Sequence, residues 1–214
     1  MKSKDIFKSK SSIAYELIDK YEYPYEVLDK IEDYILEKSK TLGEDFVCMN
    51  DNIWIHKNAN ISDTASINGP AIIDDGADIR HCAFIRGNAI IGKNAVIGNS
   101  CEIKNSIIFD KVEVPHFNYV GDSILGYKSH LGAGVILSNL RTDRKNVIID
   151  KKYDTRRNKV GAFLGDYVEI GCNSVLNPGT IILHDTSVYP LTSVRGIVKE
   201  NSIVKSMENI VKKD

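Results

Sequence analysis

Two basic side chains, Arg86 and Lys104, lie 18 residues apart, and each directly follows an isoleucine. In a chain that coils with a period of 18, these charges stack on one edge at the β-sheet spacing of roughly 5 Å. Like charges at that distance repel unless an anion lies between them. Arginine and lysine both favour phosphate, so the pair predicts a phosphate site. The alternative is a pair of solvated side chains that point apart.

Three further candidates lie where a repeat is interrupted. His116 falls in the irregular stretch 115–122, and Asn139 and Lys145 fall in a longer excursion, residues 138–163. Histidine suits a general base because its unperturbed pKa lies near neutral pH. A lone histidine is often structural instead, and its place at a break in the repeat favours the catalytic interpretation.

A six-residue repeat must position these side chains. Isoleucine recurs every six residues from Ile55 to Ile103, and a small or aliphatic residue stands four places after each. A period of six gives no continuous face on a 3.6-residue helix, so it predicts a stacked solenoid. The register slips near Ile108 and again before Leu125, and the repeat resumes after the excursion, from Leu164. A long excursion in a compact solenoid is usually functional.

The pattern divides the chain into three parts. For residues 1–50 the pattern predicts an N-terminal helical segment, and residues 1–10 are expected to be frayed. Its amphipathic helices are expected to dock on the end or the side of the solenoid and cap it. Residues 51–199 predict the solenoid, with an inserted loop near 138–163. The apolar spacing in 200–214 predicts a closing C-terminal helix.

Composition argues against several classes of protein. The formal net charge of −1 gives no global field for nucleic acid or a membrane. No apolar stretch approaches the roughly 18 residues that span a bilayer, and the polar N-terminus is not a signal peptide. The 4 cysteines show no C-x-x-C spacing, so we expect reduced thiols in a cytoplasmic protein and no metal site.

The interruptions resemble a known family. The resemblance rests on His116-Phe117-Asn118-Tyr119-Val120-Gly121-Asp122, on Leu131-Gly132-Ala133-Gly134 and on Asn139. These segments resemble the acetyltransferase domain of the bifunctional glucosamine-1-phosphate acetyltransferase/N-acetylglucosamine-1-phosphate uridyltransferase family. The form Ser138-Asn139-Leu140-Arg141 and the basic insertion are closer to the archaeal-type sugar-1-phosphate nucleotidylyltransferase/acetyltransferases. The similarity covers roughly residues 20–200, and the nucleotidyltransferase domain is expected to be absent because no Gly-rich nucleotide-binding segment precedes the repeats.

The resemblance implies an all-β fold, a left-handed parallel β-helix of about seven coils, each made of three hexapeptides. It implies a homotrimer with sites between adjacent subunits. The implied activity is acetyl-CoA-dependent N-acetylation of an amino-sugar 1-phosphate, such as glucosamine 1-phosphate, in nucleotide-sugar biosynthesis. No metal is required for that transfer.

The resemblance also assigns residues. His116 is implied as the general base, Arg86 and Lys104 as ligands of the sugar phosphate, and Tyr119, Asn139 and Lys145 as further substrate ligands. Three residues fall on the acetyl-CoA side: His130, Ala133 and Cys172. The sequence departs from the family there, because His130 replaces an asparagine, Cys172 a serine, and Leu140 an aromatic residue. Backbone N–H groups of the turn 131–134 are candidates to stabilise the oxyanion.

Two other functions remain open. The departures on the donor side favour a non-catalytic solenoid that binds sugar phosphates or nucleotide sugars, or a partner of a separate nucleotidyltransferase. A γ-class carbonic anhydrase shares the β-helix and holds its metal with three histidines. His81 and His116 would fit that pattern, but Gly121 stands where the third histidine is expected.

Overall fold

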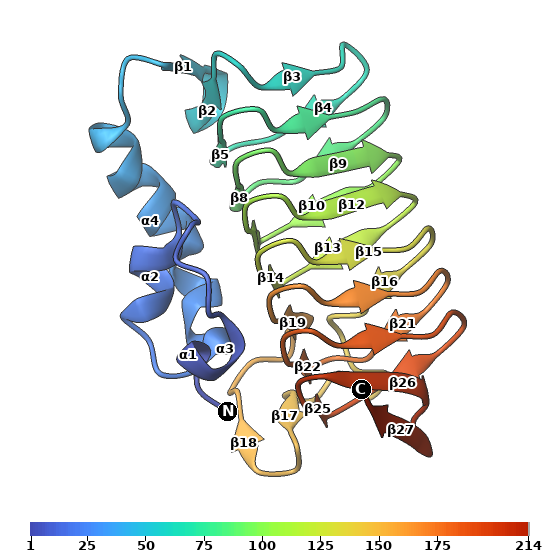
Figure 1. Cartoon of the computed structure of the whole chain (residues 1–214). Helices are drawn as coiled ribbons and strands as arrows, with labels where there is room; N and C mark the ends of the chain where they lie inside the picture. The colour runs from blue at the N-terminus through green and yellow to red at the C-terminus, as the bar shows by residue number, and fades with distance from the viewer. Residues whose placement is uncertain (214) are drawn as a thin grey trace.

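The computed structural model describes residues 1–213. Its main body is a parallel β-helix of about eight coils stacked along one axis (Figure 1). Three long sheets form its sides, and an 18-residue step along the chain moves one strand along a sheet, as in the pairing of Ile67 with Ile85 and of Ile85 with Ile103. The expected solenoid is therefore confirmed, with about eight coils where about seven were predicted.

The strands of each sheet follow one another along the solenoid axis. Sheet 1 runs β1 (Phe46–Met49), β2 (Ile53–His56), β5 (Ala71–Ile73), β8 (Ala89–Ile91), β11 (Ser106–Ile108), β14 (Ile124–Leu125), β19 (Ala162–Leu164), β22 (Thr180–Ile182), β25 (Ile197–Val198). Sheet 2 runs β4 (Ser66–Ile67), β7 (Phe84–Ile85), β10 (Glu102–Lys104), β13 (Tyr119–Gly121), β16 (Ile136–Leu137), β21 (Val175–Leu176), β24 (Ser193–Val194). Sheet 3 runs β3 (Asn60–Ile61), β6 (Asp78–Ile79), β9 (Val96–Asn99), β12 (Glu113–His116), β15 (His130–Leu131), β20 (Glu169–Ile170), β23 (Ser187–Val188), β26 (Ser202–Ser206), β27 (Asn209–Lys212).

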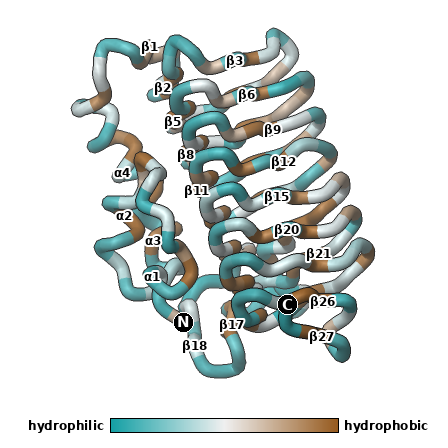
Figure 2. Tube along the Cα trace, in the orientation of Figure 1, coloured by the Kyte–Doolittle hydropathy of each residue, from teal (hydrophilic) through white to brown (hydrophobic). Residues whose placement is uncertain are grey.

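The core lies inside the coils. The repeated isoleucines and the small residues four places after them point inward, and Ala77, Ala95 and Cys101 are fully buried. Figure 2 shows the hydrophobic residues concentrated on the strands and the hydrophilic ones at the turns. Many turns hold a residue in the left-handed region, including Asn88 and Asn105 with φ of 49° and 46°. Asparagine tolerates this conformation better than most residues, so it suits the sharp corners.

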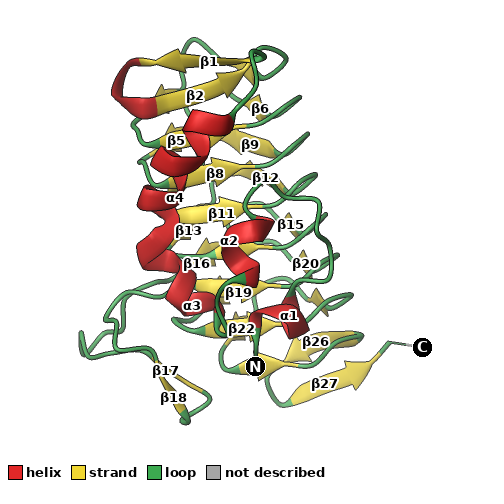
Figure 3. Cartoon of the chain, turned by 90° about the vertical axis from the view of Figure 1, so that its left-hand side faces the viewer, coloured by secondary structure: helices red, strands yellow, loops and turns green. Residues whose placement is uncertain are grey.

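The N-terminal helices cover the outer face of sheet 1 (Figure 3). In this sheet the outward position is both apolar and buried in coil after coil: Ile72, Ile90, Ile107, Ile124, Phe163, Ile181. The covering segment contains α1 (Ser3–Ile6), α2 (Tyr15–Asp19), α3 (Pro24–Val27), η1 (Leu28–Lys30), α4 (Ile31–Lys38), η2 (Ser39–Thr41), and η3 (Asn50–Asn52) follows β1. The helices therefore dock on the side of the solenoid rather than on its end.

Two expectations about the chain ends were wrong. Residues 1–10 are not frayed, because α1 packs on the solenoid and Phe7 stacks on Phe109 with ring centroids 5.4 Å apart. Residues 200–214 do not form a helix: over the described part, β26 extends sheet 3 in parallel with β23, and β27 folds back antiparallel to β26. Because β26 continues the solenoid, it also accounts for the eighth coil.

The excursion folds as a docked hairpin. Its strands β17 (Ile148–Ile149) and β18 (Tyr153–Asp154) pair antiparallel, and the hairpin lies below α3 in Figure 3. The Tyr153 ring lies 5.5 Å from the Tyr23 ring, and Arg157 forms an ion pair with Asp29. The insertion is thus held against the N-terminal segment.

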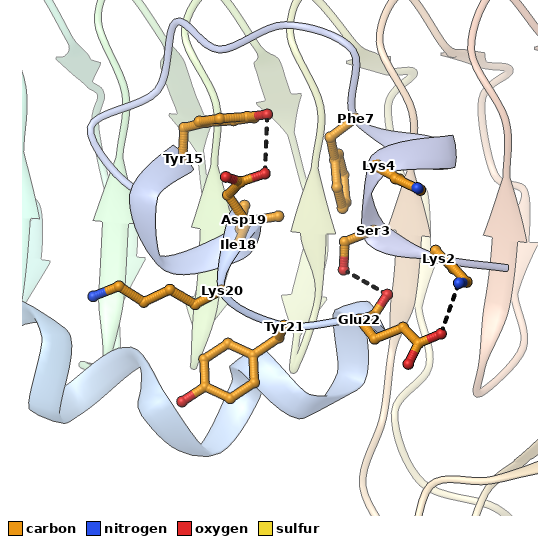
Figure 4. A pocket seen from close by; sticks show the side chains of 10 residues that line it. All are labelled: Lys2, Ser3, Lys4, Phe7, Tyr15, Ile18, Asp19, Lys20, Tyr21 and Glu22. Atoms are coloured by element: carbon orange, nitrogen blue, oxygen red, sulfur yellow. Dashed lines mark hydrogen bonds and ion pairs between the residues drawn. The ribbon is translucent and has the colours of Figure 1, made fainter.

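The N-terminal segment also encloses a cavity of about 240 Å³ that is lined only by residues 2–22 (Figure 4). Its polar groups bond to one another: Ser3 Oγ donates to the Glu22 carbonyl at 3.3 Å, and Lys2 Nζ lies 3.0 Å from Glu22 Oε1. None of the predicted site residues lines it. No helix of residues 1–213 is both long and apolar enough to cross a membrane.

Candidate functional site

Arg86 and Lys104 lie on adjacent coils, as their spacing predicts. Each follows the core isoleucine of a sheet 2 strand, and those isoleucines, Ile85 and Ile103, are register partners. The Arg86 backbone N–H donates to the Ile103 carbonyl at 2.8 Å. The two charges therefore stand at the corner where sheet 2 passes into sheet 1.

The chain itself supplies a carboxylate for each of these cations. Arg86 Nη1 lies 2.6 Å from Glu102 Oε1, and Lys104 Nζ lies 3.3 Å from Asp122 Oδ2. The hydrogen bond to Glu102 raises the pKa of the Arg86 guanidinium. A phosphate that binds here would have to compete with these carboxylates or share the cations with them.

Asp122 is the centre of this corner, and sequence reasoning gave it no role. Its side chain is 3% exposed. Oδ1 accepts from Asn105 Nδ2 at 2.8 Å, and Oδ2 accepts from Asn139 Nδ2 at 2.5 Å as well as from Lys104. One buried carboxylate thus links side chains from three successive coils, and every bond to it is charge-assisted.

Tyr119 and Asn139 meet above Gly121. Asn139 Nδ2 also donates to Tyr119 Oη at 3.1 Å. A Cβ at Gly121 would lie 2.5 Å from Tyr119 Oη and 2.9 Å from Asn139 Nδ2, so only glycine leaves room for this contact. Burial, and next the nearby Asp122 charge, raise the pKa of the Tyr119 phenol, which stays protonated and can donate to a ligand oxygen.

His116 lies at a different corner, where sheet 3 passes into sheet 2. It ends β12, its side chain is exposed, and the turn after it is fixed by the buried amide of Asn118. Asn118 Oδ1 accepts from the His116 backbone N–H at 3.0 Å, and Asn118 Nδ2 donates to the Gly132 carbonyl at 2.9 Å. Asn118 therefore sets the position of the histidine.

Ala133 and Cys172 stack on His116 in the next two coils. The Gly134 N–H donates to the His116 carbonyl at 2.9 Å, and the Asn173 N–H donates to the Ala133 carbonyl at 2.8 Å. His130 does not join this column, because it lies on the outer face of sheet 3. There its Nδ1 lies 2.9 Å from Glu169 Oε2, beside a cavity of about 500 Å³.

Lys145 is exposed in the insertion, where its backbone N–H donates to Asp143 Oδ1 at 3.2 Å. Its neighbours Arg144 and Asn146, but not Lys145 itself, line a groove of about 760 Å³ that also reaches Lys104. The structure therefore brings Lys104, Tyr119 and Asn139 together with Arg86 beside them. It places His116, Ala133 and Cys172 at the opposite edge of sheet 2, and Lys145 apart from both.

The described residues contain free cysteine thiols and no candidate metal site. Within residues 1–213, no three His, Cys, Asp or Glu side chains gather closely enough to hold a metal ion. Cys48, Cys82 and Cys172 are exposed free thiols, and Cys101 is a buried one. Burial raises the pKa of the Cys101 thiol.

Several curated proteins are similar to this chain over part of its length. A bifunctional sugar-1-phosphate nucleotidylyltransferase/acetyltransferase of Sulfurisphaera tokodaii is 38% identical over 88 residues, 40% of this chain and 22% of that protein. The bifunctional protein GlmU of Methanococcus maripaludis strain C5 is 34% identical over 108 residues, 50% of this chain and 26% of that protein. The chain thus matches about a quarter of the length of these relatives.

Solved structures are similar at lower identity. The acetyltransferase domain of PglB from Neisseria gonorrhoeae, in complex with acetyl coenzyme A, is 15% identical with a TM-score of 0.38, covering 86% of this chain and 66% of that one. PerB from Caulobacter crescentus, in complex with CoA and GDP-perosamine, is 18% identical with a TM-score of 0.36, covering 75% of this chain and 56% of that one.

A family model describes the solenoid itself. The model of the GMPPB C-terminal domain matches residues 67–204, which is more than half of the chain and includes both corners described above. The matched segment begins in β4 and ends in β26, so it covers most of the repeats and the whole insertion. The chain belongs to the GMPPB C-terminal domain family.

Proposed function

We propose that this chain is an acetyl-CoA-dependent N-acetyltransferase whose acceptor is an amino-sugar phosphate, with glucosamine 1-phosphate as the simplest member of that class. The observation that carries the proposal is the cluster at Asp122, which holds Lys104 and Asn139 in fixed positions beside Tyr119. A cation, an amide and a phenol together suit a sugar phosphate, because they offer donors to both phosphate and hydroxyl oxygens. The Sulfurisphaera tokodaii relative, whose name includes acetyltransferase, supports the same class of reaction.

In the proposed reaction, His116 accepts a proton as the acceptor amine attacks the thioester carbonyl of acetyl-CoA. The new N–C bond forms, the C–S bond breaks, and the CoA thiolate leaves and takes up a proton. Fixing both substrates on rigid solenoid surfaces reduces the entropic cost of bringing them together. Lys104 and Arg86 contribute by holding the phosphate.

Existing backbone hydrogen bonds limit which N–H groups of the turn 131–134 are free to stabilise the oxyanion. The Gly132 N–H already donates to Ile170 at 2.7 Å and the Gly134 N–H donates to His116. The N–H of Ala133 has no acceptor among residues 1–213. Ala133 is therefore the donor from this turn that we assign to the developing oxyanion.

We also propose that the active form is a homotrimer with its sites between subunits. The corner beside His116 exposes apolar side chains, with Phe117 61% and Leu191 80% exposed. Sheet 1 is covered by the chain's own helices, so a second copy must meet sheet 2 or sheet 3. A neighbour at that corner would bury the apolar residues and cover His116, which one subunit leaves exposed.

The decisive experiment measures acetyl transfer from acetyl-CoA to glucosamine 1-phosphate and galactosamine 1-phosphate by the wild-type chain and by His116→Ala. Loss of a general base costs about 10²–10⁴-fold in rate, so we expect kcat to fall by that factor. His81→Ala, which changes a histidine at the same corner two coils away, serves as the matched control. No turnover with any amino sugar, or equal rates in His116→Ala, would contradict the proposal.

A second function is favoured by the position of His130. This residue pairs with Glu169 on sheet 3 instead of joining Ala133 and Cys172 at the donor corner. The chain could then bind sugar phosphates or nucleotide sugars without transferring an acetyl group. Tight binding of glucosamine 1-phosphate with no measurable binding of acetyl-CoA would select this alternative.

A further inference from the structure

A groove lies between the N-terminal segment, the corner that holds Lys104, and the insertion. We call it the insertion groove, and it is lined by Leu28, Asp29, Glu32, Asn88, Lys104, Asn105, Asp122, Arg144, Asn146, Arg156, Arg157, Asn158, Lys159. Its volume of about 760 Å³ lies within the range of about 300–1,000 Å³ typical of small-molecule sites. It adjoins the proposed phosphate site because it shares Lys104 and Asp122 with it.

The groove has an excess of positive charge that the chain does not neutralise. Two of its cations are paired internally, Arg157 with Asp29 and Lys104 with Asp122. The other three are Arg144, Arg156 and Lys159, whose side chains are exposed and have no hydrogen-bond or ion-pair partner in the described chain. Glu32, which accepts from Asn88 Nδ2 at 3.4 Å, is the one groove carboxylate not already paired with a cation.

The packing of the insertion holds in place the backbone that carries these three cations. Val147 and Ile149 are buried, so the hairpin is anchored by apolar contacts. Thr155 Oγ1 donates to the Val147 carbonyl at 2.8 Å and so ties the two arms of the insertion together. The ion pair of Arg157 with Asp29 then fixes the segment between Arg156 and Lys159 against the N-terminal segment.

The charge of the groove exceeds what one sugar phosphate requires. A monophosphate at Arg86 and Lys104 would leave Arg144, Arg156 and Lys159 without an anion. A second phosphate linked to the first would lie in the groove that these cations line together with Lys104, and arginine forks bind phosphate oxygens in pairs. Resting on the proposed function, we propose that the natural acceptor carries its amino sugar on a nucleoside diphosphate, whose diphosphate binds in the insertion groove. The chemistry at the amine is unchanged.

The test compares binding of inorganic pyrophosphate and orthophosphate to the full chain by isothermal titration calorimetry. We expect pyrophosphate to bind at least about tenfold more tightly, since its second phosphate accepts additional charge-assisted hydrogen bonds. In the double variant Arg144→Gln/Arg156→Gln this preference should fall to near unity. Lys151→Gln is the matched control, because Lys151 is an exposed cation of the same insertion that does not line the groove. Equal binding of the two anions, or an unchanged preference in the double variant, would overturn the proposal.

Acceptor kinetics separate this inference from the function on which it rests. We expect kcat/KM for UDP-glucosamine or its GDP-linked counterpart to exceed that for glucosamine 1-phosphate by at least about tenfold, and the advantage to disappear in the double variant. Turnover of glucosamine 1-phosphate with no advantage for either nucleotide-linked acceptor would overturn the inference alone. Pyrophosphate preference without acetyl transfer to any acceptor would overturn the proposed enzyme while leaving the diphosphate site in place.

Discussion

At the scale of single residues, the site depends on a carboxylate that binds no substrate in the proposed reaction. Asp122 is buried and accepts hydrogen bonds from three side chains on neighbouring coils. A buried carboxylate is costly unless its oxygens are bonded, and removing an acceptor leaves donors unsatisfied. Lys104 and Asn139 owe their positions to this residue.

The first prediction concerns Asp122→Asn. The new amide NH₂ finds an acceptor only if Asn105 or Asn139 turns its amide oxygen toward it, and the bond from Lys104 loses its negatively charged partner. We expect the free energy of unfolding to fall by about 1–3 kcal/mol. Urea denaturation measures it, with Asp33→Asn, at an exposed position of α4, as the control. A variant as stable as the wild type would show that the bonds to Asp122 contribute nothing net.

The second prediction concerns Gly121→Ala. The added methyl group would lie 2.5 Å from Tyr119 Oη, so the phenol and the Asn139 amide must move. We expect KM for the acceptor to rise by about tenfold or more with a smaller change in kcat, because positioning rather than proton transfer is affected. Gly43→Ala, whose Cβ would meet nothing within 4 Å, is the control. If both variants keep the wild-type KM, Tyr119 and Asn139 do not contact the acceptor.

At the scale of elements, the repeat was predictable and the docking of the helices was only partly so. The isoleucine ladder determines which side chains point inward, and its period of 18 is enough to place Arg86 beside Lys104. The apolar outward column of sheet 1, with Ile72 and Ile90 18 residues apart, is a sequence signal that sheet 1 must be covered. From that signal, docking of the helices on the side of the solenoid, and not on its end, could have been predicted.

Other features could not be obtained from spacing. Residues 203–211 have apolar positions that fit an amphipathic helix, but pairing with β23 along the open end of sheet 3 satisfies more backbone groups and forms a strand. The carboxylates that neutralise Arg86 and Lys104 come from neighbouring coils, and the cations of the insertion groove meet only through the folded hairpin. The 18-residue step that leads from Arg86 to Lys104 leads on to Asp122 and so points to that carboxylate, but periodicity contains no information about the contacts within the insertion.

The third prediction concerns the docking of α4. Tyr34 Oη donates to the Ile13 carbonyl at 2.6 Å, and burial, then Glu16, raises the pKa of this phenol to about 12. The unfolded chain loses this proton near pH 10, so between about pH 10 and about pH 12 the folded chain holds more protons and loses stability as pH rises. Tyr34→Phe removes the hydrogen bond and lowers stability at pH 8, but it also removes this slope.

The gap in unfolding free energy between the wild type and Tyr34→Phe should therefore narrow from pH 8 to pH 11, as measured by urea denaturation at each pH. Absorbance at 295 nm should show one fewer late-titrating tyrosine in the variant. Tyr15→Phe, which removes a phenol at a partly exposed position of α2, is the control. A constant gap for Tyr34→Phe would mean that its phenol ionises alike in both states.

At the scale of the whole molecule, the faces of the solenoid have different roles. Sheet 1 carries the helices, sheet 2 separates the acceptor corner from the histidine corner, and the histidine corner exposes apolar residues. Tyr189 is 47% exposed and Val175 37% exposed near Leu191. Apolar side chains that gather on one edge of a soluble protein usually mark an interface.

The last prediction tests that edge through Leu191→Asn. Leu191 has a φ of 62° and is 80% exposed, so an isolated chain gains little from a leucine there, and asparagine adopts this conformation at lower cost. We expect the folded variant to retain its thermal stability as a single chain, while the trimer dissociates at protein concentrations where the wild type remains trimeric. Light scattering coupled to gel filtration measures the mass. Val47→Thr, which changes an exposed apolar residue on β1 far from this corner, should leave the mass unchanged.

Because the proposed site lies between subunits, acetyl transfer by Leu191→Asn should fall in proportion to the trimer that remains. Full activity in a monomeric variant would show that one chain contains the whole site.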